Sequence, residues 1–338
     1  MLTRARPLRP LAARRAGVHM QANSHSLPLK VYIEDTDAYM VVYYGNYVRF
    51  FERAAASTLV GMTEAGRLLR HKRLGLGMIS ADGVKYSSAA VLGDTCHVEV
   101  TSHGIDADGR LACAAALVRS EDGETLCAAS DLRLGWVDGS SSRGVETTWP
   151  ASPSRVGAAA PAAPAAPAAL AELGEPPAAS EAPLIDEGLR LHLDECSVVG
   201  TLSMHAALRY FERHRTEYLG GPEALASMAG TGVNVVVARM NGVRLLDAAH
   251  RTYVGAELAL RCSIQIKARG TQIVFRQWLL GREPGPEETA GAATGDGGRQ
   301  LTPLARADVI CLCIDATTGK IVSAPDVVRE RLAAYSPH

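Results

Sequence analysis

Two aspartates, Asp35 and Asp37, are the residues of this sequence whose type and spacing best suit chemistry. They follow a strand-like stretch in which Val31 and Ile33 are apolar with period two, and they precede an apolar segment that predicts a long helix. A carboxylate beside an apolar slot can act as a general base or a nucleophile, and the N–H groups of a helix N-terminus can stabilise an oxyanion. The acidic turn is therefore a candidate chemical site.

The same arrangement is also typical of a structural helix cap. Aspartate side chains accept hydrogen bonds from the first N–H groups of a helix, and their charge complements the helix dipole. For an isolated Asp-x-Asp sequence we favour the cap, so the choice between the two roles depends on the surrounding residues and on the elements that position them.

The first of those elements form one unit over residues 29–137. The pattern predicts a strand over 29–34, a helix over about 46–73 and then about four antiparallel strands separated by turn signals. The helix has too much apolar surface to lie exposed, so we expect it to pack across a curled antiparallel sheet. The predicted fold class is α+β.

Residues 185–335 repeat this unit. A shift of 160 positions places Phe51-Glu52-Arg53 on Phe211-Glu212-Arg213, and a second helix is predicted over about 204–228. We assign the recurring Glu52 and Arg53 to the frame, as a surface or interface ion pair. Two tandem units can pair their sheets edge to edge, which removes exposed edges and makes the chain a covalent pseudo-dimer.

Three further segments differ in composition from these units. Residues 1–28 are rich in arginine and free of acidic residues, which is typical of a transit peptide or of a disordered tail. This composition predicts a mitochondrial or plastid location, with a cytoplasmic one if the segment is only a tail. Residues 138–184 are rich in alanine and proline and predict a linker, and residues 282–303 predict a disordered insertion.

Composition excludes several function classes. The chain has 338 residues, of which 47% are hydrophobic and 21% are charged, and its formal net charge is −1, so nothing favours nucleic-acid binding. No apolar run is long enough for a membrane span. The 7 cysteines include no CxxC pair and predict neither a disulfide framework nor a zinc site.

The stretch Val31–Arg53, VYIEDTDAYMVVYYGNYVRFFER, resembles the signature of the 4-hydroxybenzoyl-CoA thioesterase family of hotdog-fold proteins. The residues that match its D-x-D turn and the motif after it are Asp35, Thr36, Asp37, Val41, Val42, Tyr43, Asn46 and Tyr47. The strand-loop-strand sequence over 85–100, which contains a Gly-Asp pair, is similar to a second family feature. The resemblance implies a double hotdog, two tandem copies of a long helix wrapped by a curled antiparallel sheet.

The resemblance also implies the site. Asp37 would act on the thioester as general base or nucleophile, the backbone N–H of Tyr44 would polarise the carbonyl, and Asn46 would orient the turn or the substrate. With the whole motif around it, Asp37 is assigned to chemistry and Asp35 to the cap. The residues expected to contact the substrate are Tyr39, Met40, Val42, Tyr43 and Tyr47. Met40 stands where the family usually has glycine, and Tyr44 where many relatives have histidine.

Coenzyme A would enter as part of the substrate, and no metal or other cofactor is expected. Its phosphates require cations at the entrance of the slot. The candidates are Arg70, Lys72 and Arg73, which lie at the end of the first predicted helix. Cations at that position also complement the helix dipole, and this structural interpretation stays open.

The second copy keeps the frame but loses the reactive residues. At the positions of Asp37, Tyr43, Tyr44 and Asn46 it has Ser197, Ser203, Met204 and Ala206. We therefore predict one competent site per chain, which the second half completes through strands around Val235–Arg239 or through the segment Asp247–Arg251.

Three functions follow from these expectations. The leading one is an acyl-CoA thioesterase, active as an intrachain pseudo-dimer that can pair again into a homo-oligomer. The second is an acyl-ACP thioesterase of an organelle. The third is a non-catalytic protein that binds acyl thioesters or serves assembly on the same scaffold.

Overall fold

The computed structural model describes most of the two predicted units and little of the segments around them. The described residues are 24–37, 40–138, 145–146, 176, 184–185, 189–221, 223–224, 230–282 and 301–333. Residues 1–23 of the predicted leader (1–28), most of the linker and residues 283–300 of the predicted insertion (282–303) lie outside the described residues.

The first half consists of a strand, two consecutive helices and an antiparallel meander. Its elements are β1 (Ser24–Lys30), the 3-10 turn η1 (Ile33–Asp35), α1 (Tyr44–Ala55), the π-helical segment η2 (Ala56–Val60), α2 (Met62–Lys72), β2 (Leu74–Asp82), β3 (Val84–Tyr86), β4 (Thr95–Ile105), β5 (Leu111–Arg119), β6 (Thr125–Asp138) and β7 (Val145–Glu146).

The second half repeats the order of one central helix followed by long strands. Its elements are β8 (Leu184–Ile185), η4 (Leu193–Glu195), α3 (Met204–Tyr218), β9 (Val233–Leu245), η5 (Asp247–Arg251), β10 (Leu258–Lys267), η6 (Ala268–Gly270), β11 (Gln272–Arg282), β12 (Leu301–Asp315) and α5 (Asp326–Ala333).

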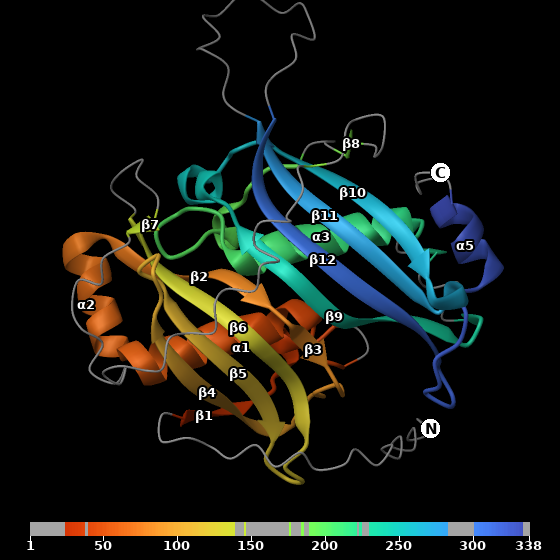
Figure 1. The fold of residues 1–338 in the computed structure, drawn as a ribbon, viewed down its shortest axis with the longest axis horizontal. Helices are drawn as coiled ribbons and strands as arrows, with labels where there is room; N and C mark the ends of the chain where they lie inside the picture. The colour runs from red at the N-terminus through yellow and green to blue at the C-terminus, as the bar shows by residue number, and fades with distance from the viewer. Residues whose placement is uncertain are drawn as a thin grey trace, which may run out of the picture.

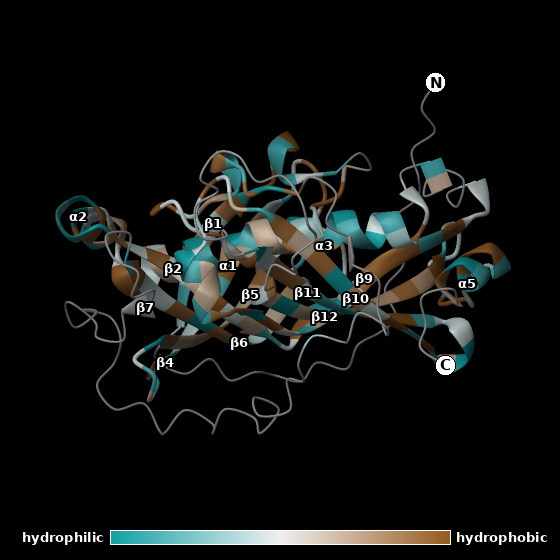
Figure 2. Ribbon diagram, turned by 90° about the horizontal axis from the view of Figure 1, so that it is seen from above, coloured by the Kyte–Doolittle hydropathy of each residue, from teal (hydrophilic) through white to brown (hydrophobic). Residues whose placement is uncertain are grey.

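The described strands of both halves form one sheet of 12 strands. Ten follow the order β1-β4-β5-β6-β2-β9-β12-β11-β10-β8, while β3 pairs with β6 and β9 and β7 pairs with β6 beside this path. The halves meet where β2 and β3 pair with β9, with the register pairs Ser80↔Arg244, Ala81↔Val243, Val84↔Met240 and Lys85↔Arg239. Figure 1 shows the red-to-yellow half and the green-to-blue half side by side, and Figure 2 shows α1 and α3 on the same side of the sheet. The predicted α+β fold and the edge-to-edge pairing are confirmed.

The central helices form because their apolar residues are buried on almost every side. On α1, Phe50, Phe51, Ala54 and Ala55 are at most 1% exposed, and they belong to one hydrophobic core that includes α3 and the strands of both halves. Burying each of the two phenylalanine side chains contributes about 1.5–3 kcal/mol. Only the arginines of α1 remain exposed.

Several predicted element boundaries were wrong. β1 starts at Ser24, so the strand includes residues that were assigned to the leader, and it ends at Lys30 instead of continuing to 34. The first predicted helix is interrupted at Gly61, whose φ of 90° is compatible with glycine but breaks the helical ladder. In the region of the second predicted helix (204–228), α3 ends at Tyr218, before the glycines at 220 and 221.

The second half differs from its prediction in two further ways. Residues 233–245 form the single strand β9 where two strands were expected, and Asp247–Arg251 is a 3-10 turn. The C-terminal helix α5 was not predicted.

All seven cysteines are free thiols. Among the described residues, no helix is long and apolar enough to cross a membrane.

One carboxylate fastens the two halves at the point where their sheets meet. Asp82 Oδ1 accepts hydrogen bonds from the N–H of Gly83 and from the N–H of Gly242 in the other half, both at 2.8 Å. These bonds lie between the two short stretches of pairing with β9, where the ladder is interrupted.

Replacing Asp82 by alanine should therefore lower the free energy of unfolding by about 1–3 kcal/mol, because two backbone N–H groups lose their acceptor. Urea denaturation of the full chain measures this. Asp82→Asn is the matched control, since its carbonyl oxygen can still accept both bonds, and it should retain most of the stability. Equal stability of the alanine variant and wild type would contradict this role.

Candidate active site

The Asp37 turn closes on itself immediately ahead of α1. The Asp37 N–H donates to the carbonyl of Val41 (2.8 Å), and the Met40 N–H donates to the carbonyl of Asp37 (3.0 Å). Thr36 and Val42 form a bridge at the base of the turn. Asp37 is exposed and therefore lies at the surface end of this turn. Tyr39, an expected substrate contact, lies outside the described residues.

Asp35 and Asn46 fix this turn from below. Asp35 is 6% exposed, and its Oδ2 accepts the N–H of Tyr32 at 3.1 Å. Its backbone carbonyl accepts the N–H of Tyr43 (3.1 Å) and the Nδ2–H of Asn46 (2.9 Å). Asp35 thus has the structural role that was expected. Asn46 was expected to orient either the turn or the substrate, and its hydrogen bond orients the turn.

The N-terminus of α1 carries no side-chain cap, whereas that of α3 does. Tyr43 occupies the N-cap position of α1 and offers no acceptor to the first N–H groups of the helix. In α3 the N-cap is Ser203, whose Oγ accepts the N–H of Ala206 at 3.1 Å. The first N–H groups of a helix lack intrahelical partners, so the N–H of Tyr44 is open to an external acceptor. An oxyanion is the acceptor that a helix N-terminus favours.

The side chains of Tyr43 and Tyr44 join α1 to α3. Both hydroxyls donate to the carbonyl of Leu208, at 3.2 and 2.8 Å, and the two rings meet edge to face with centroids 4.7 Å apart. The guanidinium of Arg215 lies 4.9 Å from the centre of the Tyr44 ring. Burial raises the pKa of Tyr44 to about 12, with Arg215 acting in the opposite direction, so the phenol keeps its proton at physiological pH.

Tyr47 holds the loop that borders the turn. It is 2% exposed, and its hydroxyl oxygen accepts the N–H of Ala90 at 2.9 Å, while the carbonyl of Ala90 accepts the N–H of Val42 at 2.8 Å. Val42 is itself 5% exposed. Both residues were expected to contact substrate, but the structure places them in the core beneath the turn, where they support it.

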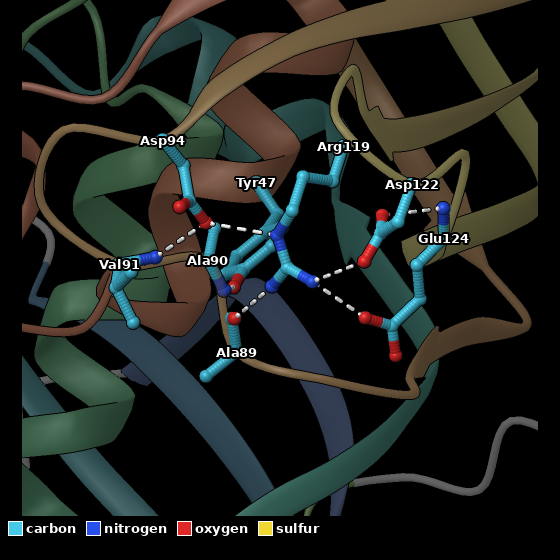
Figure 3. A network of polar contacts seen from close by, with 8 residues as sticks. All are labelled: Tyr47, Ala89, Ala90, Val91, Asp94, Arg119, Asp122 and Glu124. Carbon is cyan, nitrogen blue, oxygen red and sulfur yellow. Dashed lines mark hydrogen bonds and ion pairs between the residues drawn. The ribbon is translucent and has the colours of Figure 1, made fainter. Parts of the chain in front are cut away.

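The loop 89–94 is fixed from its other side by Arg119 (Figure 3). The guanidinium bonds Asp94 (3.3 Å), Asp122 (3.2 Å), Glu124 (2.6 Å) and the carbonyl of Ala89 (3.2 Å). Asp94 belongs to the Gly-Asp pair noted in the sequence, and its Oδ2 also accepts the N–H of Val91 at 3.0 Å. The turn is thus built on a preorganised support.

The basic cluster Arg70, Lys72 and Arg73 does not lie beside Asp37. It is exposed at the end of α2, which follows the C-terminus of α1, and α1 is 12 residues or about 18 Å long. Figure 1 shows α2 at the far end of α1. These cations are therefore too far away to contact the reacting groups at Asp37, and their role as ligands of the distant coenzyme A phosphates stays a prediction.

The start of β2 instead contacts the second-half turn that corresponds to the Asp37 turn. A Cβ atom on Gly75 would lie 2.6 Å from Val198 Cγ2 and 2.9 Å from Val199 Cγ1, so glycine is required for this close approach. In that turn the Oγ of Ser197 lies 3.0 Å from Thr201 Oγ1. The second turn is packed against the first half and its hydroxyl is already engaged.

Glu52 and Arg53 do not form the expected ion pair. Glu52 is half-buried and accepts the N–H of Met78 at 3.1 Å, and burial raises the pKa of its carboxyl group. Arg53 is exposed. Their counterparts also have separate partners, because Glu212 pairs with Arg215.

The segment Asp247–Arg251 likewise lies elsewhere than expected. It leads to Thr252, whose carbonyl accepts the N–H of Leu202 (3.0 Å), so it borders the second-half turn instead of completing the Asp37 site. No group of three or more histidine, cysteine or acidic side chains able to hold a metal occurs in the described part of the chain.

Comparison with solved structures identifies this architecture as the double hotdog fold. The chain superposes on a putative oleoyl thioesterase from Lactobacillus plantarum with a TM-score of 0.59 at 7% identity, covering 86% of this chain and 96% of that one. An acyl-ACP thioesterase from Bacteroides thetaiotaomicron superposes with a TM-score of 0.51 at 11% identity, covering 86% of this chain and 98% of that one. The 12:0-ACP thioesterase from Umbellularia californica superposes with a TM-score of 0.52 at 10% identity, covering 85% of this chain and 93% of that one.

At the level of sequence, the chain is similar to the acyl-CoA thioesterase YbgC of Haemophilus influenzae. The two are 36% identical over 80 residues, which make up 24% of this chain and 59% of that protein. The chain thus spans little more than half the length of this curated relative. No protein-family model matches the chain.

Met40 adopts a left-handed backbone conformation. Its φ is 62°, and the corresponding residue of the second half is Gly200 with φ 86°. An L-residue with a side chain is about 1–2 kcal/mol less stable in this conformation than in its preferred ones. The Asp37 turn therefore holds strain that the second-half turn avoids.

Met40→Gly should raise the free energy of unfolding by about 0.5–1 kcal/mol, because the relief of strain exceeds the added entropy of the unfolded chain. Gly200→Ala is the matched reverse change. No atom lies within 4 Å of its new Cβ, so its cost of about 1 kcal/mol is conformational. Chemical denaturation measures both. Destabilisation by Met40→Gly would contradict the strain.

Proposed function

We propose that this chain is a thioester hydrolase that cleaves an acyl-CoA at the Asp37 turn. The observation that carries the proposal is the exposed carboxylate of Asp37 next to an uncapped helix N-terminus. The similarity to a protein named acyl-CoA thioesterase supports the choice of substrate class. The resemblance of the turn to 4-hydroxybenzoyl-CoA thioesterases supports hydrolysis of a CoA thioester and does not fix the acyl group.

The proposed reaction uses two groups of α1 and the turn. The substrate carbonyl oxygen lies at the N–H of Tyr44, which stabilises the negative charge that develops there. Asp37 either takes a proton from the attacking water or attacks the carbonyl carbon itself and is released by water. The carbon–sulfur bond breaks, the coenzyme thiolate takes a proton, and a carboxylic acid is formed. Asn46 keeps the turn in register through Asp35.

The second half would complete the slot without catalysing the reaction. Ser197 stands where the first half has the carboxylate, and Val198 and Val199 of the same turn pack on Gly75. The second turn therefore lacks the group that would attack or accept a proton, and it is packed against the first half. We therefore propose one working site per chain.

Asp37→Asn should lower kcat for acyl-CoA hydrolysis by about 10²–10⁴-fold, because the amide can neither accept a proton nor attack. Steady-state kinetics on a panel of aliphatic and aromatic acyl-CoAs measures this. Ser197→Ala is the matched control in the second half and should leave kcat unchanged. Thermal unfolding of both variants verifies that they fold.

Full activity of Asp37→Asn would overturn the assignment of Asp37. Absence of turnover by the wild type on every acyl-CoA and acyl-ACP, together with saturable binding of one of them, would favour a non-catalytic acyl-thioester-binding protein. The same panel presented on acyl carrier protein tests the carrier. A higher kcat/KM for acyl-ACP than for the same acyl-CoA would replace coenzyme A as the proposed carrier.

A further inference from the structure

Arginines line up across the centre of the sheet, on the face away from the helices. Cross-strand partners run from Arg133 on β6 through Ser80 on β2, Arg244 on β9 and Arg306 on β12 to Trp278 on β11. Directly paired residues in a sheet point to the same face. The row therefore crosses the junction between the halves.

The neighbours of these residues show which face it is. Val243 and Leu245 flank Arg244 in the chain, and Ala305 and Ala307 flank Arg306, and all four belong to the core that contains α1 and α3. Successive residues of a strand point to opposite faces. The arginine side chains therefore lie on the other side of the sheet from Asp37.

Arg306 is buried, and some of its N–H donors have no hydrogen-bond acceptor in the part of the chain that the structure describes. It is 6% exposed, and its Nε and Nη1 have no hydrogen-bond partner among the described residues. Its contacts are Nη2 to Asp308 Oδ1 at 3.4 Å and the guanidinium 5.4 Å from the centre of the Trp278 ring. Within the described chain, Nε and Nη1 are thus buried donors without an acceptor, which costs free energy that an anionic ligand would offset.

Arg244 and Arg110 add two more such groups. The Nε atoms of both are buried and have no partner in the described part of the chain, while each side chain stays half-buried, so an anion can approach. Arg244 and Arg306 are direct cross-strand partners, and the backbone N–H of Arg110 donates to Asp106, which pairs with Arg133 of the same row. Burial lowers the pKa of Arg244; Arg110 and Arg306 act in the same direction, while Asp82 and Asp131 act against it.

The carboxylates nearby are largely committed to other groups. Asp106 and Asp131 both pair with Arg133, at 3.1 and 2.8 Å. Asp308 is shared between Arg276 and Arg306, and Asp82 accepts two backbone N–H groups at the junction. Asp247, His250 and Arg251 come from the adjacent 3-10 turn, where His250 is kept neutral by burial, which lowers its pKa to about 4.

We propose that Arg110, Arg244 and Arg306 form a binding site for a phosphate or diphosphate group, on the face of the sheet opposite the Asp37 turn. Guanidinium groups match the oxygen geometry of phosphate through paired N–H donors, and clustered arginines are typical of phosphate recognition. The site draws on both halves, because Arg110 comes from the β4–β5 turn and the other two from β9 and β12. It does not depend on the proposed hydrolase activity.

Isothermal titration of the full chain with pyrophosphate tests the site. Wild type should bind, and Arg306→Gln and Arg110→Gln should each weaken the Kd by about tenfold or more, as expected for the loss of a charge-assisted pair. Arg53→Gln, an exposed change on α1, is the control and should leave the Kd unchanged. Arg110 lies on a surface turn, so its variant tests the site even if Arg306→Gln fails to fold.

Thermal unfolding separates a ligand site from a structural role. Without ligand, Arg244→Gln should unfold at a Tm equal to or above that of wild type, because repulsion is relieved, and pyrophosphate should raise the Tm of wild type only. No binding by wild type, or equal affinity in all arginine variants, would overturn the proposal.

Competition then identifies the source of the phosphate. Displacement of pyrophosphate by coenzyme A would support a site for the nucleotide of the thioester carrier. Pyrophosphate binding that coenzyme A leaves intact would support a separate phosphorylated ligand. An arginine variant that no longer binds pyrophosphate but hydrolyses acyl-CoA normally would leave the assignment of Asp37 and Tyr44 intact. The two proposals can therefore fail independently.

Discussion

The pairing of β2 and β3 with β9 is the constraint on which the rest of the molecule depends. It joins two curled sheets into one and leaves α1 and α3 side by side on the same face. Because the helices are adjacent, the hydroxyls of Tyr43 and Tyr44 reach the carbonyl of Leu208 in the other half. The candidate site is therefore fixed by contacts between the halves as much as by its own turn.

The two halves keep the same frame and divide the chemistry unequally. Asp35 and Glu195 each close the 3-10 turn before a helix, and the carbonyl of each is held by a side chain, Asn46 in one case and Ser203 in the other. In the first half, the helix is uncapped and Met40 is strained. Missing caps and left-handed residues each cost about 1 kcal/mol, and such costs concentrate at functional sites.

Sequence alone predicted the fold class and the repeat, because both rest on patterns that local residues carry. The spacing of Phe51-Glu52-Arg53 and Phe211-Glu212-Arg213 is visible without coordinates. Helix ends were predicted less well, since Gly61 interrupts the first helix only through a backbone conformation that its neighbours do not reveal. Asn46 was singled out in advance, but its bond to the carbonyl of Asp35 required the structure.

Contacts made across the chain could not be predicted. The carbonyl of Leu208 has no sequence signal, and the arginine row depends on the register of five strands. The cluster Arg70, Lys72 and Arg73 is visible in the sequence, but its separation from Asp37 by the length of α1 required the structure.

The most direct test of one-sided catalysis is a crystal structure of the chain with a 2-oxoalkyl thioether of coenzyme A, a ketone analogue of acyl-CoA that keeps a carbonyl group and cannot be hydrolysed. One analogue per chain is predicted, with its carbonyl oxygen within hydrogen-bond distance of the Tyr44 N–H and its reacting carbon facing Asp37. An analogue bound at Ser197, or equal occupancy of both turns, would contradict the claim that only the first half carries the reaction.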